Sequence, residues 1–494
     1  MNIKEAKAEI TNTLRAYLAR DEYGAYRIPP VRQRPVLLMG PPGVGKTQIM
    51  EQIAQETGVG LVAYTITHHT RQSAVGLPFI ETRVYDGEER RVTEYTMSEI
   101  LASVHNLMER TGVREGILFL DEINCVSETL APMMLQFLQC KTFGNQALPE
   151  GWLIVAAGNP PEYNRSVREF DVVTLDRVRR MDVTEDFAVW KEYALRKGLH
   201  GAVVSYLDIR KEHFYRIETT ADGAQFATAR GWEDLSELLY AYEALGLRVD
   251  RAVVGEYIQF PRIAGDFANY LQLYRKYQQS YRVDDILRGA WRRVTASAFR
   301  DAPFDEKLSV MGLLLSRLGE AARKTRRQDA VTAALHRALT EFKTRIETEP
   351  PRRVLAALIA QRRDDLRRAK EAGQLSAEAH GLRRRELAAL EGLSDAITGD
   401  DGAMDAARRY FAAVREEREA LGAETGAMLD RAFAFLEEAA GQGQELVLFV
   451  TELTAGYDTA WFLAEFGCEA YYRHNRELFF DETRSRITRA LTES

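Results

Sequence analysis

The chain has 494 residues, of which 46% are hydrophobic and 28% charged, and its formal net charge is −7 at pH 7. This length predicts two or three domains, and the composition excludes disorder throughout the chain. The acidic balance lacks the basic excess typical of proteins that mainly bind nucleic acid. Three scattered cysteines exclude a disulfide framework or a CxxC metal site, and the first ten residues have charges where a signal peptide needs an apolar run. We therefore expect a cytoplasmic protein with no membrane insertion.

The first part of the chain alternates between strand and helix patterns. Residues 2–20 carry apolar side chains at three- and four-residue steps, which predicts an amphipathic helix. Short apolar runs then alternate with helical patterns; they are PVLLM (35–39), LVAYTI (61–66), GILFL (116–120), WLIVAA (152–157) and MDV (181–183). This alternation predicts an α/β fold over residues 1–186, in which a parallel five-stranded sheet has helices on both faces.

Strand signals fade after residue 187. Residues 232–245 and 265–281 have helical spacing, so we expect a helical lid domain over residues 187–282. Beyond residue 283 the composition shifts toward Ala, Leu, Arg and Glu. We expect residues 283–494 to form an all-α C-terminal region that binds a partner, with a helical hairpin within residues 352–390.

A glycine-rich motif follows the first predicted strand and precedes a helical pattern. Its glycines let the backbone point N–H groups at phosphate oxygens, its lysine reaches the β- and γ-phosphates, and its hydroxyl binds Mg²⁺. The motif therefore predicts a P-loop NTPase core, and it does not by itself decide between ATP and GTP. The predicted nucleotide-binding residues are Gly40, Pro41, Pro42, Gly43, Val44, Gly45, Lys46, Thr47 and Gln48.

Polar side chains end the next two apolar strands of the predicted core. Asp121 and Glu122 end the run at 117–120, where Asp121 can hold Mg²⁺ and Glu122 can orient and deprotonate a water molecule. Asn159 ends the run at 152–157, and its neutral amide can hold the attacking water or the γ-phosphate. The alternative for Asn159 is a turn-forming residue before Pro160.

Several motifs in this order resemble the AAA+ ATPases. They are GPPGVGKT, ILFLDEIN, AAGNP, LDRVRR and FPRIAGDFANYL, within residues 1–280, and the DEIN and GNP forms are most similar to the MoxR branch. The resemblance implies Mg²⁺-dependent ATP hydrolysis. It assigns Lys46 and Thr47 to Walker A, Asp121 and Glu122 to Walker B, and Asn159 to sensor 1.

The resemblance also implies two functional arginines. Arg177 matches an arginine finger that enters the nucleotide site of the neighbouring subunit, although Arg179 and Arg180 lie close enough to compete for that role. Arg262, at the start of a predicted lid helix, matches sensor 2. A guanidinium suits both tasks because its fork contacts phosphate oxygens bidentately.

Residues 68–96 form a segment longer than a bare loop, with a possible hairpin across Tyr85, Asp86 and Gly87. The family resemblance suggests that this segment is an insertion in helix 2 that lines a ring pore, and long ordered insertions usually have a function. His68 and His69 have no third ligand at suitable spacing, so we expect a polar loop rather than a metal site.

The resemblance implies a homo-oligomeric ring, expected to be a hexamer. Its expected work is chaperone-like remodelling or maturation of a protein complex, with a protein client or a von Willebrand factor A domain partner. Two alternatives stay open. Residues 321–370 are rich in Lys and Arg, so a nucleic-acid-stimulated motor or restriction-type translocase is an alternative that is not favoured. The other alternative is a scaffold whose assembly is switched by ATP binding.

Overall fold

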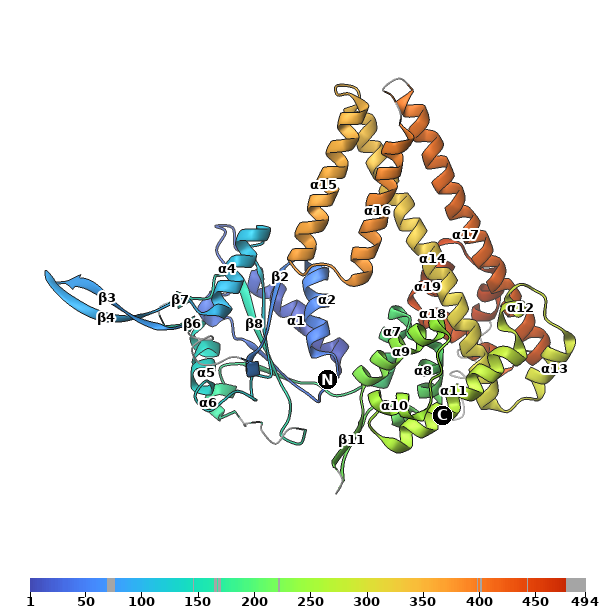
Figure 1. Cartoon of the computed structure of the whole chain (residues 1–494), viewed down its shortest axis with the longest axis horizontal. Coiled ribbons are helices and arrows are strands. Elements are labelled where there is room, and N and C mark those ends of the chain that lie inside the picture. The colour runs from blue at the N-terminus through green and yellow to red at the C-terminus, as the bar shows by residue number, and fades with distance from the viewer. Residues whose placement is uncertain are drawn as a thin grey trace, which may run out of the picture. The chain divides into compact units, whose positions relative to one another are not determined.

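The chain forms two compact units, and Figure 1 draws the whole computed structural model. The structure describes residues 1–68, 76–144, 146–163, 167, 170–220, 223–397, 399, 402–441 and 443–476. The first unit consists of Met1–Asp186 and Ala360–Arg384, and the second of Phe187–Ile359 and the described residues from Arg385 onward. The further division into lid and C-terminal region at residue 282 stays a prediction.

A parallel five-stranded sheet forms the centre of the first unit, as predicted. Its strand order is β2-β5-β8-β1-β9, and every neighbouring pair is parallel. The strands are β1 (Val36–Met39), β2 (Gly60–Thr65), β5 (Gly116–Asp121), β8 (Trp152–Gly158) and β9 (Arg179–Asp182). The prediction for β9 began two residues late, because this edge strand opens with two arginines instead of apolar residues.

Helices cover both faces of this sheet. Successive strand residues point to opposite sides, so the apolar strands present apolar side chains on both faces. Along β5, Ile117 and Phe119 belong to the core shared with the first two helices, whereas Leu118 and Leu120 belong to the core on the other face. The helices of this part of the chain are α1 (Ile3–Leu18), α2 (Lys46–Thr57), α4 (Glu99–Thr111), α5 (Ala131–Cys140) and α6 (Val172–Leu175), with short 3₁₀ helices η1 (Pro30–Arg32) and η2 (Ile66–His68). The structure confirms the predicted α/β P-loop core.

A two-stranded antiparallel hairpin projects from the first unit (Figure 1). It consists of β3 (Pro78–Tyr85) and β4 (Glu88–Tyr95), and Asp86 and Gly87 form its turn with positive φ angles of 53° and 83°. A hairpin was expected at this place. Another small hairpin, of the two-residue strands β6 (Thr142–Phe143) and β7 (Gln146–Ala147), follows α5.

The second unit is mostly helical, and its larger hydrophobic core extends from Trp190 to Tyr471. Its helices are α7 (Phe187–Lys197), α8 (Gly201–Ile209), η3 (Lys211–His213), α9 (Ala229–Leu245), α10 (Arg251–Tyr257), α11 (Pro261–Tyr281), α12 (Val283–Leu287), α13 (Arg293–Asp301), α14 (Phe304–Arg345), α17 (Ala403–Ala440), α18 (Gln444–Ala455) and α19 (Tyr457–Glu465). The hairpin of β10 (Arg216–Thr220) and β11 (Gly223–Ala227) was not expected from the sequence, because its strands are polar and half exposed.

The long helix α14 takes part in two hydrophobic cores. Leu314 and Leu318 in its first half belong to the large core, whereas Leu335 and Phe342 belong to a smaller one. The smaller core also contains residues of α15 (Pro351–Glu371), α16 (Ala377–Ala396) and α17, and α15 and α16 form the predicted helical hairpin. No helix in the described ranges is both long and apolar enough to cross a membrane.

Candidate functional site

The glycine-rich motif forms the loop between β1 and α2, at the carboxyl edge of the sheet. Gly40 to Gly45 make up the loop, and Lys46, Thr47 and Gln48 form the first turn of α2. Two of its glycines have φ angles that favour glycine, 76° at Gly43 and 94° at Gly45. At Gly40 a Cβ atom would lie 2.8 Å from the carbonyl oxygen of Val183, so this position also has no room for a side chain. The loop thus presents backbone at the N-terminus of a helix, where anions bind.

The Lys46 side chain is buried, with 8% of its surface exposed. Its Nζ donates hydrogen bonds to the backbone oxygens of Gly40 at 2.7 Å and Pro41 at 2.9 Å, and to Oδ1 of Asn159 at 2.9 Å. These acceptors are neutral, so they satisfy the ammonium without neutralising its charge. Lys46 can therefore exchange them for phosphate oxygens, to which charge-assisted bonds are stronger.

Thr47 and Asp121 lie close enough to share a cation. Thr47 Oγ1 donates to Asp121 Oδ2 at 3.1 Å, and the two residues belong to α2 and to the end of β5. Hydroxyl and carboxylate oxygens are the hard ligands that suit Mg²⁺, which usually binds one or two carboxylates together with substrate phosphates. This donor pair beside the phosphate-binding loop fits Mg²⁺. Among the described residues, no group of three or more His, Cys, Asp or Glu side chains could hold a metal ion alone.

Glu122 follows β5 in a left-handed backbone conformation, with φ of 56°. Its backbone N–H donates to Oδ1 of Asp121 at 2.9 Å, which helps hold this turn. Its carboxylate oxygen Oε2 accepts a hydrogen bond from Thr67 Oγ1 at 2.8 Å. Strained residues of this kind cluster at functional sites, which fits the role predicted for Glu122.

Asn159 is positioned by a buried partner that the sequence analysis did not single out. Asn124, which is 2% exposed, donates from Nδ2 to the backbone oxygen of Asn159 at 2.8 Å and accepts from its backbone N–H at 3.3 Å. A Cβ atom at Gly158 would lie 2.6 Å from Asn124 Oδ1, so the strand must approach closely here. The fourth residue of the DEIN motif was the available signal for Asn124.

Arg177 lies exposed just after α6. Its Nη1 donates to the side-chain oxygen of Gln139, and it forms no ion pair within the described residues. Asp171 caps α6, and hydrogen bonds from Thr174, with a smaller contribution from the charge of Arg177, lower the pKa of Asp171. The capped helix therefore fixes the backbone just before the arginine.

The two competing arginines lie in edge strand β9 and already have acidic partners within the chain. Arg179 binds Glu9 Oε1 at 2.6 Å and also contacts Thr13 of α1. Arg180 binds Asp182 at 2.9 Å. Arg177 is thus the one of the three that makes no ion pair with a described acidic residue.

Arg262 belongs to the second unit, at the exposed start of α11. It lines a polar hollow of about 440 Å³ together with Arg210, Arg251, His213 and Asp266. Five predicted residues, Lys46, Thr47, Asp121, Glu122 and Asn159, are brought together in the first unit. Their side chains form a site that can bind a nucleotide with a divalent cation and hold a water molecule.

Residues 35–178 match the family model for the AAA domain of the dynein-related subfamily. This match covers the loop, both acidic residues, Asn159 and Arg177, and it supports an AAA+ ATPase core. The match does not distinguish the MoxR branch from other branches of the AAA+ ATPases. No curated protein matches the chain significantly.

Proposed function

We propose that this chain is a Mg²⁺-dependent ATPase of the MoxR-like AAA+ branch, active as a ring and coupled to remodelling or maturation of a protein complex. The observation that carries the proposal is the contact between Lys46 and Asn159, which joins the phosphate-binding loop to the strand expected to sense the γ-phosphate. The AAA domain match over the same residues supports ATP as the nucleotide.

Each side chain of the site has a role in this proposal. Lys46 binds the β- and γ-phosphates in place of its present carbonyl acceptors. Mg²⁺, when bound, neutralises negative charge on the phosphate oxygens, and Thr47 and Asp121 would hold it. Glu122 orients a water molecule in line with the γ-phosphorus and takes its proton as the new P–O bond forms and the bond to ADP breaks.

Completion of the site by a neighbouring subunit would add a positive charge at the γ-phosphate, where negative charge develops during the reaction. Arg177 suits this role because it is exposed and has no acidic partner among the described residues, whereas Arg179 and Arg180 are paired. We place Arg262 at the nucleotide as sensor 2, on the resemblance of its segment alone. A closed ring, with a hexamer as the expected size, would bring each Arg177 to another subunit's ATP.

The hairpin of β3 and β4 supports a protein client. Both faces of the hairpin carry exposed apolar side chains, with Ile80 (72%) and Val84 (65%) on one face and Phe79 (45%) and Tyr85 (44%) on the other. The second of these faces also holds ion pairs such as that between Arg83 and Glu94. We propose that the exposed apolar side chains of the hairpin contact the client in the ring pore and that the helical second unit binds a von Willebrand factor A domain partner.

The test is ATP turnover of the full chain against protein concentration, for wild type, Glu122→Gln, Arg177→Ala and an equimolar mixture of the two variants. We expect each variant to lose turnover by at least about 100-fold and the mixture to regain part of it, because some interfaces pair an intact Glu122 with an intact Arg177. Arg180→Ala is the matched control and should keep wild-type turnover.

Three outcomes would contradict the proposal. Normal turnover of Arg177→Ala at every concentration would reject the finger, and nucleotide binding without turnover in wild type would favour the ATP-gated scaffold. Stimulation by nucleic acid with steep salt dependence would favour the translocase instead.

A further inference from the structure

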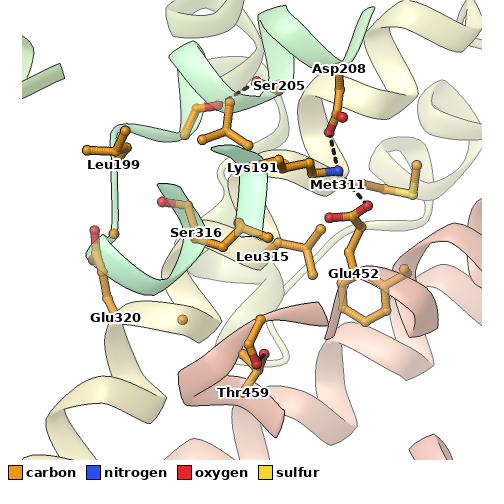
Figure 2. Close-up of a pocket in the computed structure, with 18 of the residues that line it drawn as sticks. Lys191, Leu199, Ser205, Asp208, Met311, Leu315, Ser316, Glu320, Glu452 and Thr459 are labelled. Atoms are coloured by element: carbon orange, nitrogen blue, oxygen red, sulfur yellow. Dashed lines mark hydrogen bonds and ion pairs between the residues drawn. The ribbon is translucent and has the colours of Figure 1, made fainter. Parts of the chain in front are cut away.

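A cavity of about 370 Å³ lies within the second unit, where α7, α8, α14, α18 and α19 meet (Figure 2). Its volume is in the range of sites that hold small organic ligands. The wall is mainly aliphatic, and its apolar side chains include Leu195, Leu199, Val204, Leu308, Met311 and Leu315. It lies apart from the P-loop site, in the other unit, so it is a separate candidate for binding.

Three charged side chains line one part of this cavity, and Figure 2 shows them converging. Lys191 Nζ lies 2.7 Å from Asp208 Oδ2 and 2.6 Å from Glu452 Oε1. The exposed fractions of the three side chains are 16% for Lys191, 31% for Asp208 and 16% for Glu452. Among the described residues, no other cationic side chain forms an ion pair with either carboxylate.

This cluster carries an excess negative charge. Burial alone would lower the pKa of Lys191, but the Glu452 and Asp208 carboxylates outweigh it and raise the pKa. Lys191 is therefore a cation at neutral pH and compensates one carboxylate of the two. A poorly solvated carboxylate without a full partner is costly, and a second cation with N–H donors would stabilise it.

The other charged side chains that line the cavity are either fully paired or exposed. Asp458 binds two guanidinium groups, Arg323 at 2.8 Å and Arg326 at 2.6 Å. Glu320 is exposed and pairs with Arg317 at 3.2 Å, and Lys211 is exposed as well. Among the charged residues that line the cavity, Asp208 and Glu452 are thus the ones that combine excess negative charge with an aliphatic wall.

We propose that this cavity binds a small amphiphilic cation, with its ammonium or amidinium group against the carboxylates of Asp208 and Glu452, beside Lys191, and its apolar body against Leu315 and Met311. The apolar body would gain the hydrophobic free energy of leaving water, and the cationic end would form charge-assisted hydrogen bonds. This site is independent of ATP hydrolysis, so its test does not depend on the proposed enzymatic function.

Gly319 provides a variant that fills the cavity while keeping the fold. It lies within α14, lines the cavity, and a Cβ atom there would meet no other atom within 4 Å. Replacing a helical glycine also raises helix propensity, so Gly319→Leu should fold. Gly381→Leu is the matched control, because Gly381 lies within α16, away from the cavity lining, and has the same open space at Cβ.

The experiment measures binding of three probes with one apolar body to the full chain by isothermal titration calorimetry at pH 7. The probes are 4-phenylbutylamine, 4-phenylbutanol and 4-phenylbutyrate. We expect the amine to bind about tenfold or more tightly than the alcohol and the carboxylate, because charge-assisted bonds add to the apolar contact. Gly319→Leu should weaken amine binding by about tenfold or more, and Gly381→Leu should bind like wild type.

Glu452→Gln tests the charge separately, since it leaves Lys191 paired with Asp208. This variant should lose the preference for the amine and keep the affinity for the alcohol. Equal binding of amine and alcohol to wild type, stronger binding of the carboxylate, or no binding of any probe at millimolar concentration would overturn the proposal. So would amine binding that Gly319→Leu leaves unchanged.

Discussion

Thr67 Oγ1 donates a hydrogen bond of 2.8 Å to Oε2 of Glu122, the carboxylate proposed to activate water. Thr67 lies in η2, directly after β2, and Glu122 lies directly after β5, and these two strands are neighbours in the sheet. The bond holds the carboxylate by one oxygen toward η2. In the proposed reaction this carboxylate faces a water molecule instead, so Thr67 restrains it in the structure described here.

Removal of the Thr67 hydroxyl is expected to raise basal ATP turnover. A hydrogen bond of this kind contributes about 1 kcal/mol, so Thr67→Val should increase turnover by up to about fivefold. The measurement is steady-state ATP hydrolysis at saturating nucleotide. Thr67→Ser retains the hydroxyl and should match wild type, whereas lower turnover in Thr67→Val would mean that the bond positions Glu122 for catalysis.

The left-handed backbone of Glu122 predicts a conflict between stability and activity. A residue with a Cβ atom at φ of 56° is strained by about 1 kcal/mol relative to glycine. Glu122→Gly should therefore keep or raise the free energy of unfolding while it abolishes turnover. Urea unfolding followed by circular dichroism checks this, with Glu122→Gln, which keeps the strain, as control. A loss of stability in Glu122→Gly alone would contradict it.

Asn124 is expected to matter for both stability and hydrolysis. Asn124→Ala removes both of its hydrogen bonds to the Asn159 backbone, at a buried position, and should lower the free energy of unfolding by about 1–3 kcal/mol. Turnover should fall as well, because Asn159 loses its support. Asn106→Ala, at an exposed position on α4, is the control. Unchanged turnover in folded Asn124→Ala would show that Asn159 needs no such support.

Lys141 predicts a dependence of stability on alkaline pH. It ends α5, its Nζ donates to the backbone oxygen of Pro30 at 2.9 Å, and burial lowers the pKa of Lys141 to about 8. Between pH 8 and the ordinary value of 10.5, the unfolded chain holds a proton that the folded chain has released. The free energy of unfolding therefore rises with pH in this window, by about 2 kcal/mol from pH 7.5 to 9.5.

This contribution can be isolated by comparing wild type with Lys141→Met in urea unfolding at both pH values. The difference between the two proteins should shift in favour of wild type as pH rises. Lys343→Met, which changes an exposed lysine of α14, should show no such shift. A constant difference between wild type and Lys141→Met would contradict the lowered pKa.

Much of the first unit could be predicted because its signals are local. A buried parallel strand reads as a short apolar run, so β1, β2, β5 and β8 were expected within about a residue of their bounds. The loop residues from Gly40 to Thr47 carry their chemistry in one continuous motif. The polar residues after β5 and β8 could be placed next to this loop, because the carboxyl ends of parallel strands meet at one edge of the sheet.

The parts that were missed depend on which elements become neighbours. The bonds from Thr67 to Glu122 and from Asn124 to Asn159 join residues 55 and 35 positions apart. The DEIN motif marks Asn124, but neither pairing can be predicted before the strand order β2-β5-β8 is known. The hairpin of β10 and β11 was missed because polar, half-exposed strands lack the apolar alternation that marks a strand.

The length of helix α14 allows it to transmit movement from one hydrophobic core to another. It runs without interruption for 42 residues, a span of about 60 Å, and its two halves are anchored in different hydrophobic cores. A continuous helix of this kind is a lever arm. A tilt of about 5° at the core near Leu314 would displace the far end near Phe342 by several ångströms, roughly 4 Å over the intervening length. Small changes in the larger core would thus reach the smaller one as amplified displacement.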